Sequence, residues 1–268
     1  MAILPSTLRS STLGQDPSGL RFVSVETTAL GGRGQACFFV PDAERPLPLV
    51  ILLHGAYGSC WDWATRGGVH VAAARAMGRG ALPPMVLAMP GDGGAGASTG
   101  YFRQEHADFE AWVMDELESL CAFICPQVRG TERFIAGYSM GGFGALRLAA
   151  KYEGHWNAVA AHSSVTALSD LPPFLDAASC APMPLDPRDA DVWPWLEAAG
   201  PRLPPLRFDC GRDDPLLAAN RALSDKLRVT RIPHTFEVHP GGHDFDYWSE
   251  RIPDTLSFFA THTKGPSR

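Results

Sequence analysis

The sequence lacks several features that would mark a membrane, secreted or nucleic-acid-binding protein. No run of 18 apolar residues is long enough for a transmembrane helix. Residues 1–15 are rich in Ser and Thr and contain no apolar core of the kind a signal peptide needs. Basic clusters are absent, and 23 Lys and Arg against 29 Asp and Glu give a net charge of −6. We therefore expect no membrane segment, no secretory leader and no nucleic acid partner.

Metal and redox motifs are also missing. The six cysteines show no C-x-x-C spacing, and Cys121 and Cys125 stand one helical turn apart, which suits a packed helix face. His239 and His243 are four residues apart, but Pro240-Gly241-Gly242 between them prevents the helix that would present both to a metal. We expect no metal and reduced thiols, and with no leader this predicts a cytoplasmic protein.

Nucleotide-binding loops are absent as well. Neither G-x-G-x-x-G nor G-x-x-x-x-G-K-[ST] follows a predicted strand. The glycine-rich stretch Gly91–Gly96 does follow one, but no helix start with a lysine comes after it. The sequence thus predicts no cofactor.

What is present is the pattern of one α/β domain over residues 1–268. The content of 45% hydrophobic and 19% charged residues is that of an ordinary globular protein. Apolar or alternating segments predict strands, and we count about eight of them: Arg21–Thr27, Gln35–Val40, Leu49–Leu53, Met85–Met89, Phe134–Gly137, Ala158–Ala161, Leu206–Cys210 and Thr235–His239.

Helical patterns fall between these strands: Gly68–Gly78, Asp108–Ile124, Met140–Tyr152, Pro215–Leu227 and Asp244–Thr261. Pro253 is expected to break the last helix into two pieces. Strands that alternate with helices predict a mainly parallel central sheet with helices on both faces.

One segment departs from this alternation. Residues 168–205 are proline-rich, contain Trp193 and Trp195 and have no strand signal. A long irregular insert between two buried strands is expected to fold over the strand ends as a cap. Its apolar residues, including Phe174 and Leu175, would then line a substrate pocket. The alternative is a surface decoration without substrate contact.

The most informative motif is the run from Gly137 to Gly142, which contains Ser139 in a G-x-S-x-G pattern. An apolar strand leads into it and a helix of small residues leads out, as in a nucleophile elbow. Glycines at positions 137 and 141 would remove the collisions that so sharp a turn creates. A chance match is the alternative, and the flanking elements argue against it.

A serine nucleophile needs a histidine base that a carboxylate orients. His243 follows a predicted strand in a Pro-Gly-Gly loop and is the best base, with His239 as its nearest rival among eight other histidines. The acid should follow the strand that ends at Cys210. Asp213 and Asp214 both do so, and Asp209 inside the strand is a third candidate.

The oxyanion would need backbone donors. The loop Leu52–Gly58 follows a buried strand and contains glycine, so it can turn an N–H toward the nucleophile. The expected donors are the N–H groups of Met140 and Ala56, with Tyr57 as the alternative to Ala56.

With these residues in place, the chain resembles the esterase D-type family of α/β hydrolases, which includes short-chain esterases and S-formylglutathione hydrolases. The matching blocks run in family order from about Arg21 to Ala260: Leu52–Gly55, Leu82–Val86, Gly137–Ala145, Asp209–Asp214 and Gly241–Asp244 with Trp248. The resemblance implies an α/β-hydrolase fold, Ser139 as nucleophile, His243 as base and Asp214 as acid. The block Gly91–Tyr101 departs from the family pattern, and Tyr101 is expected to supply its aromatic residue.

The sequence therefore predicts a serine carboxylesterase that acts on short-chain acyl or small aryl esters through an acyl-enzyme. Tyr57, Tyr101, Trp193 and Trp195 are the candidate substrate-binding residues. A thioesterase of the S-formylglutathione hydrolase type or an acyltransferase would use the same triad. A non-catalytic binding protein is a third alternative. The expected partner is a small-molecule ester, and the oligomeric state stays open, a homo-oligomer included.

Overall fold

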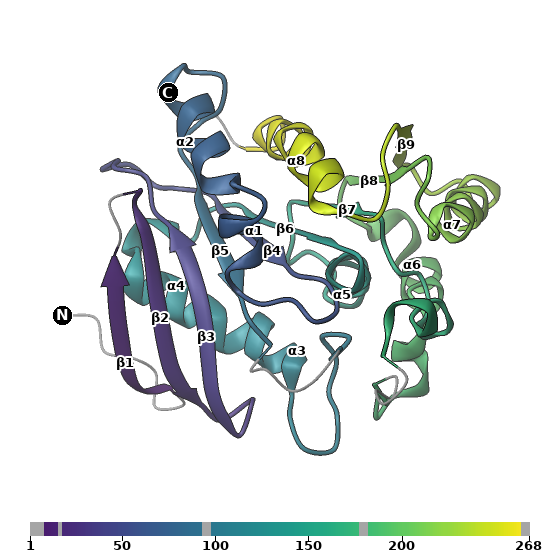
Figure 1. The fold of residues 1–268 in the computed structure, drawn as a ribbon, viewed down its shortest axis with the longest axis horizontal. Helices are drawn as coiled ribbons and strands as arrows, with labels where there is room; N and C mark the ends of the chain where they lie inside the picture. The colour runs from purple at the N-terminus through teal and green to yellow at the C-terminus, as the bar shows by residue number, and fades with distance from the viewer. Residues whose placement is uncertain (1–7, 16–17, 93–97, 177–181, 264–268) are drawn as a thin grey trace.

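A computed structural model describes residues 8–15, 18–92, 98–176 and 182–263. Its centre is a nine-stranded sheet in the order β1-β2-β3-β5-β4-β6-β7-β8-β9 (Figure 1). The strands are β1 Leu8–Gln15, β2 Leu20–Thr27, β3 Gly32–Phe39, β4 Leu49–Leu53, β5 Val86–Pro90, β6 Arg133–Tyr138, β7 Ala158–His162, β8 Leu206–Gly211 and β9 Thr235–His239. From β5 to β9 neighbouring strands run parallel, whereas β1, β2 and β3 are antiparallel to their neighbours. The predicted α/β fold with a mainly parallel sheet is confirmed.

The strand that sequence reasoning missed is β1. Its residues include Ser10, Ser11 and Thr12, so it shows neither an apolar run nor a clear alternation. What defines it is backbone pairing with β2, from Leu8 opposite Thr27 to Gln15 opposite Arg21.

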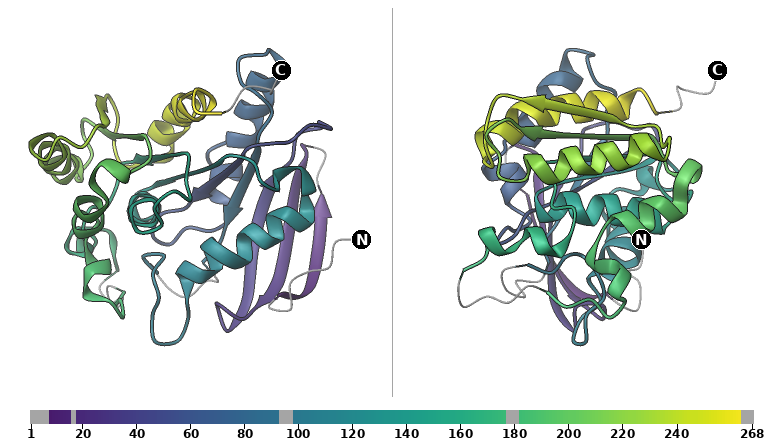
Figure 2. Two further views of the ribbon diagram at one scale, coloured as in Figure 1. Left: turned by 180° about the vertical axis from the view of Figure 1, so that it is seen from behind. Right: turned by 90° about the vertical axis from the view of Figure 1, so that its right-hand side faces the viewer.

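Helices cover both faces of the sheet (Figure 2). They are α1 Asp62–Thr65, α2 Val69–Gly78, α3 Phe109–Ala111, α4 Leu117–Ile124, α5 Met140–Lys151, α6 Trp193–Ala199, α7 Leu217–Val229 and α8 Phe245–Ala260. A π-helical turn, Trp112–Glu116, joins α3 to α4, so the predicted helix 108–124 is continuous with a local widening.

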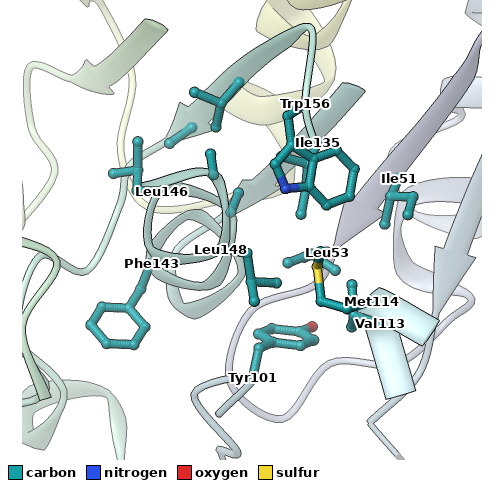
Figure 3. Close-up of a cluster of buried hydrophobic side chains, with 14 of the residues drawn as sticks. Ile51, Leu53, Tyr101, Val113, Met114, Ile135, Phe143, Leu146, Leu148 and Trp156 are labelled. Atoms are coloured by element: carbon teal, nitrogen blue, oxygen red, sulfur yellow. The ribbon is translucent and has the colours of Figure 1, made fainter. Parts of the chain in front are cut away.

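The two faces bury separate clusters because side chains alternate along each strand. On β4, Leu49, Ile51 and Leu53 belong to a cluster that also contains residues of α4, α5, α6 and α7, while Val50 and Leu52 belong to one that contains residues of α1, α2 and α8. Figure 3 shows the first cluster, in which side chains of α5 and the π-helical turn meet Ile51 and Leu53. The core thereby holds α5 against the end of β4.

Pro253 does not break the C-terminal helix, and that prediction is wrong. α8 runs without interruption from Phe245 to Ala260. Pro253 lies on the exposed side of the helix, while Ile252, Leu256 and Phe259 are fully buried on the other side. Water can therefore satisfy the carbonyl that the proline leaves unpaired, and packing holds the helix.

The segment 168–205 connects β7 to β8. In its described part it forms α6 and the short 3-10 turns Leu168–Asp170, Pro172–Phe174, Pro187–Ala190 and Gly200–Arg202. A bridge between Ala167 and Asp191 brings two of its parts together, and Leu171, Val192 and Leu196 are buried. Residues 177–181, including Cys180, lie outside the described residues.

Three other expectations concern the glycine-rich stretch, the cysteines and the lack of a membrane segment. The glycine-rich stretch 91–96 falls largely outside the described residues, because 93–97 are not among them. Cys37, Cys60, Cys121, Cys125 and Cys210 are buried. None of the described helices is both long and apolar enough to cross a membrane.

Candidate active site

The structure places Ser139 at the turn between β6 and α5, with a φ of 55° and a ψ of −120°. A positive φ is strained for a residue with a side chain. The turn is so tight that a Cβ at Gly137 would overlap the carbonyl of Gly141, and a Cβ at Gly141 would overlap that of Leu53. These two glycines therefore have the steric role that the motif predicts.

Gly141 gives a stability prediction with a matched control. Gly141→Ala should destabilise the fold by about 3 kcal/mol or more, since the new methyl group meets backbone that cannot move without opening β4. Gly78→Ala, at the end of α2, should be neutral or stabilising, because nothing lies within 4 Å of its Cβ position. Urea unfolding of both variants measures the difference, and equal midpoints would contradict it.

Ser139, His243 and Asp214 come together at the carboxyl ends of three strands. His243 Nε2 lies 3.0 Å from Ser139 Oγ, and His243 Nδ1 lies 2.9 Å from Asp214 Oδ2. These residues follow β6, β9 and β8, which are parallel, so their ends meet at one edge of the sheet. Ser139 is only 4% exposed, which keeps bulk water away from its hydroxyl.

The carboxylate that meets His243 belongs to Asp214 rather than to its neighbour. Asp214 is buried, and its Oδ1 accepts a hydrogen bond from the Leu216 N–H at 2.8 Å. Burial alone would raise the pKa of Asp214, but hydrogen bonds from His243 and the Leu216 N–H outweigh it, so the pKa is lowered. Asp213 is exposed, and its N–H donates to the Gly241 carbonyl.

The third acid candidate, Asp209, belongs to a separate buried cluster. It contacts His162 Nδ1 at 3.0 Å, accepts a hydrogen bond from Arg207 at 3.0 Å and accepts another from the Tyr247 hydroxyl at 2.8 Å. Burial would raise the pKa of Asp209, yet His162, Arg207 and Tyr247 together lower it. This cluster joins β7, β8 and α8 beneath the site.

Hydrogen bonds join the loops that carry the acid and the base. The Arg212 N–H donates to the His239 carbonyl at 2.7 Å, and the Asp213 N–H donates to Gly241 at 3.0 Å. A Cβ at Gly211 would overlap the carbonyl of Gly241, so the two loops also touch directly. We call this pair of loops, residues 211–214 and 240–243, the acid–base unit.

Two aromatic rings flank the imidazole of His243. The ring of Phe174 lies 4.5 Å from it, and that of Trp248 lies 5.1 Å from it at a steep angle. Phe174 comes from the segment 168–205, so part of this segment lies against the site. The imidazole is thus held between a ring of α8 and a ring of the segment.

The loop that should supply an oxyanion donor passes beside Ser139. A Cβ at Gly55 would lie 3.1 Å from Ser139 Cβ, so glycine allows the close approach. Ala56 follows Gly55 in this loop, residues 54–57, which we call the oxyanion loop. Met140 is the first residue of α5, and its N–H has no acceptor within the helix.

The four expected substrate-binding residues lie in different places. Tyr57 is 50% exposed in the oxyanion loop, and its hydroxyl accepts a hydrogen bond from the Asp176 N–H at 2.7 Å. Tyr101 is fully buried, so the structure does not present it to a ligand as predicted. Its hydroxyl is hydrogen-bonded to the backbone of His54 instead.

The tryptophans of α6 are likewise not brought to His243. The Lys226 ammonium of α7 stands 5.4 Å from the ring of Trp193. Lys151 and Arg188 stand 4.9 and 4.4 Å from the ring of Trp195. Both rings are half-buried and pack against the core cluster of that face, so the predicted pocket role of these residues gains no support.

A buried ionic cluster near the site was missed from the sequence. Arg147 is fully buried on α5 and donates to Glu110, Asp189 and the carbonyl of Tyr101. The available signal was a single arginine inside a helix of small and apolar residues. Asp189 belongs to the segment 168–205, so the cluster ties that segment to the helix that follows Ser139.

Within the described residues, no group of three or more His, Cys, Asp or Glu side chains could hold a metal ion.

Comparison with known proteins identifies the family of this chain. The family model described as "Putative esterase" matches residues 27–259. The chain belongs to the Esterase family. It is a carboxylic ester hydrolase, and the resemblance to esterase D-type enzymes is confirmed. Among relatives of this esterase, an acetyl esterase of Caldicellulosiruptor saccharolyticus is 26% identical over 247 residues, which cover 82% of this chain and 85% of that protein.

Other relatives are longer, and solved structures share the fold. An esterase of Mycobacterium tuberculosis is 26% identical over 89% of this chain, which spans 58% of that protein. A ferulic acid esterase has a TM-score of 0.79 at 24% identity and covers 91% of this chain and 98% of its own. An S-formylglutathione hydrolase of Staphylococcus aureus has a TM-score of 0.76 at 18% identity, over 94% and 99%. The two structures show the α/β-hydrolase fold.

Proposed function

We propose that this esterase hydrolyses short-chain acyl or small aryl esters through a Ser139–His243–Asp214 triad and an acyl-enzyme. The observation that carries the proposal is the unbroken pair of hydrogen bonds, 3.0 Å from Ser139 Oγ to His243 Nε2 and 2.9 Å from His243 Nδ1 to Asp214. This is the geometry in which an imidazole can take a proton from a hydroxyl.

The reaction follows in two halves. Ser139 Oγ attacks the acyl carbon while His243 Nε2 takes its proton, and Asp214 stabilises the resulting imidazolium. The oxyanion accepts hydrogen bonds from the N–H groups of Met140 and Ala56. The imidazolium then protonates the departing alcohol, which leaves an acyl-enzyme. Water that gives its proton to His243 attacks this ester, and as the second intermediate collapses His243 returns the proton to Ser139 Oγ and the acid is released.

The proposed preference for small substrates rests on the burial of Ser139 and on the Phe174 ring beside His243. Ser139 is 4% exposed, and Phe174 packs against His243 at 4.5 Å. The hydrogen bond from the Asp176 N–H to the Tyr57 hydroxyl joins the segment 168–205 to the oxyanion loop. We propose that this part of the segment acts as a cap. The names of the acetyl and ferulic acid esterases agree with small acyl and aryl substrates.

A panel of p-nitrophenyl esters from acetate to laurate tests this proposal, beside S-formylglutathione and a feruloyl ester. We expect kcat/KM to fall steeply with acyl length, and acetate to give a rapid burst of p-nitrophenol equal to the enzyme concentration. Laurate turned over faster than acetate would contradict the small-substrate proposal.

The same panel separates the alternatives. A much higher kcat/KM for S-formylglutathione than for any oxygen ester would favour the thioesterase. Formation of a new ester when an alcohol is added would favour the acyltransferase. The proposed reaction uses an ester substrate and no cofactor. The cytoplasmic location stays a prediction.

A further inference from the structure

Tyr101 holds the residue at the start of the oxyanion loop from two sides. Its hydroxyl accepts a hydrogen bond from the His54 N–H at 3.0 Å and donates one to the His54 carbonyl at 2.9 Å. His54 follows β4 directly and lies two residues before Ala56. Both groups are buried, so no water replaces these hydrogen bonds if the hydroxyl is removed.

The imidazole of His54 in turn restrains the next peptide, between Gly55 and Ala56. His54 Nδ1 lies 2.8 Å from the Gly55 carbonyl oxygen, which also accepts the Gly58 N–H at 3.1 Å. The Gly55 carbonyl and the Ala56 N–H belong to one planar trans peptide, in which they point in opposite directions. Fixing the carbonyl of Gly55 therefore fixes the direction of the Ala56 N–H.

Tyr101 itself is held by the helix that begins at the nucleophile. It has a φ of 56°, a strained value for a tyrosine. Arg147 of α5 donates to its carbonyl, and a Cβ at Gly144 would lie only 2.6 Å from the Tyr101 ring. Burial raises the pKa of Tyr101 well above its ordinary value, so the hydroxyl keeps the proton that it donates.

We propose that Tyr101 is a positioning residue, which aligns the Ala56 N–H of the oxyanion loop with the N–H of Met140 at the start of α5. The inference rests on the proposed triad mechanism and adds a support for its oxyanion site. Tyr101 contacts both α5 and the loop, so it sets the relative placement of the two donors. It acts through His54 and touches no reacting atom.

The test is Tyr101→Phe, which removes one oxygen and keeps the ring. Tyr152→Phe is the matched control, because the hydroxyl of Tyr152 is half-buried and donates to Glu110, not to the oxyanion loop. The enzyme is assayed with p-nitrophenyl acetate and with its thionoester, in which sulfur replaces the carbonyl oxygen. Sulfur accepts hydrogen bonds weakly, so the thionoester gains little from an aligned donor.

For Tyr101→Phe we expect a loss in kcat of about tenfold to a hundredfold with the oxygen ester and an unchanged KM, since a misaligned donor costs part of what a deleted one does. With the thionoester, kcat of the same variant should fall by less than threefold. Tyr152→Phe should change kcat by the same small factor with both substrates. Equal losses with both substrates for Tyr101→Phe, or no loss, would overturn the proposal.

Failure of the underlying mechanism would look different. In that case wild-type enzyme would show no burst of p-nitrophenol, or Ser139→Ala would retain activity. Both results are independent of Tyr101. A Tyr101→Phe variant with wild-type kcat in an enzyme that does show the burst overturns the positioning role alone.

Discussion

Ser139→Ala should lower kcat for p-nitrophenyl acetate by about 10⁴- to 10⁶-fold, with residual rates set by binding and the oxyanion donors. The reason is that this substitution removes the atom proposed to form the acyl-enzyme, while the fold around it is held by glycines and backbone. Stopped-flow assays of the wild-type enzyme and overnight assays of the variant, at matched protein concentration, together cover this range of rates. The burst of p-nitrophenol and labelling by a fluorophosphonate should disappear together.

Ser164→Ala is the matched control. Ser164 is also buried near the start of α5, but its hydroxyl donates to the Val165 carbonyl at 2.7 Å and not to His243. We expect this variant to keep kcat within a few-fold. Because serine and base act as a unit, the double variant Ser139→Ala/His243→Ala should be about as slow as either single variant. Multiplicative losses would contradict a shared step.

Asp214→Asn should lower kcat by about 10⁴-fold near neutral pH, because an amide does not hold the imidazole in the required tautomer or stabilise its charge. The adjacent Asp213→Asn removes the same charge one residue away and should leave kcat within about twofold, since that side chain is exposed. Steady-state kinetics on the two variants measure the contrast. Equal losses, or a larger loss for Asp213→Asn, would reject the assignment of the acid.

This pair also makes a prediction for stability against pH. The pKa of Asp214 is lowered in the folded protein, so its interactions stabilise the fold above the unfolded pKa of about 4 and are lost as pH falls through the folded value. Thermal unfolding between pH 3 and 6 should therefore show a smaller acid-induced fall in Tm for Asp214→Asn than for Asp213→Asn.

The parts of the fold that the sequence predicted best are those with one dominant physical signal. Strands such as β4 are buried on both faces and read as unbroken apolar runs. β1 pairs through its backbone and has no such run. The break predicted at Pro253 is wrong because the packing of a whole helix face outweighs the local effect of one proline.

The residues of the site were also predicted unequally well from the sequence. Chain order and strand ends were enough to select Ser139 and His243, which the structure brings within hydrogen-bond distance. Asp213 and Asp214 are neighbours, and only the direction of each side chain in space separates them, so residue reasoning left both open. The family resemblance suggested Tyr101 as an aromatic substrate-binding residue, whereas its burial and its hydroxyl hydrogen bonds depend on long-range contacts that the sequence does not show.

The acid–base unit has a consequence for how this site responds to strain. Its two loops hydrogen-bond to each other at the far edge of the sheet, whereas Ser139 follows β6, which lies nearer the middle. If β8 and β9 tilt together, the distance between Asp214 and His243 is conserved while the gap to the Ser139 oxygen widens. Substitutions on that outer edge would therefore weaken nucleophile activation in graded steps and leave the imidazole correctly oriented.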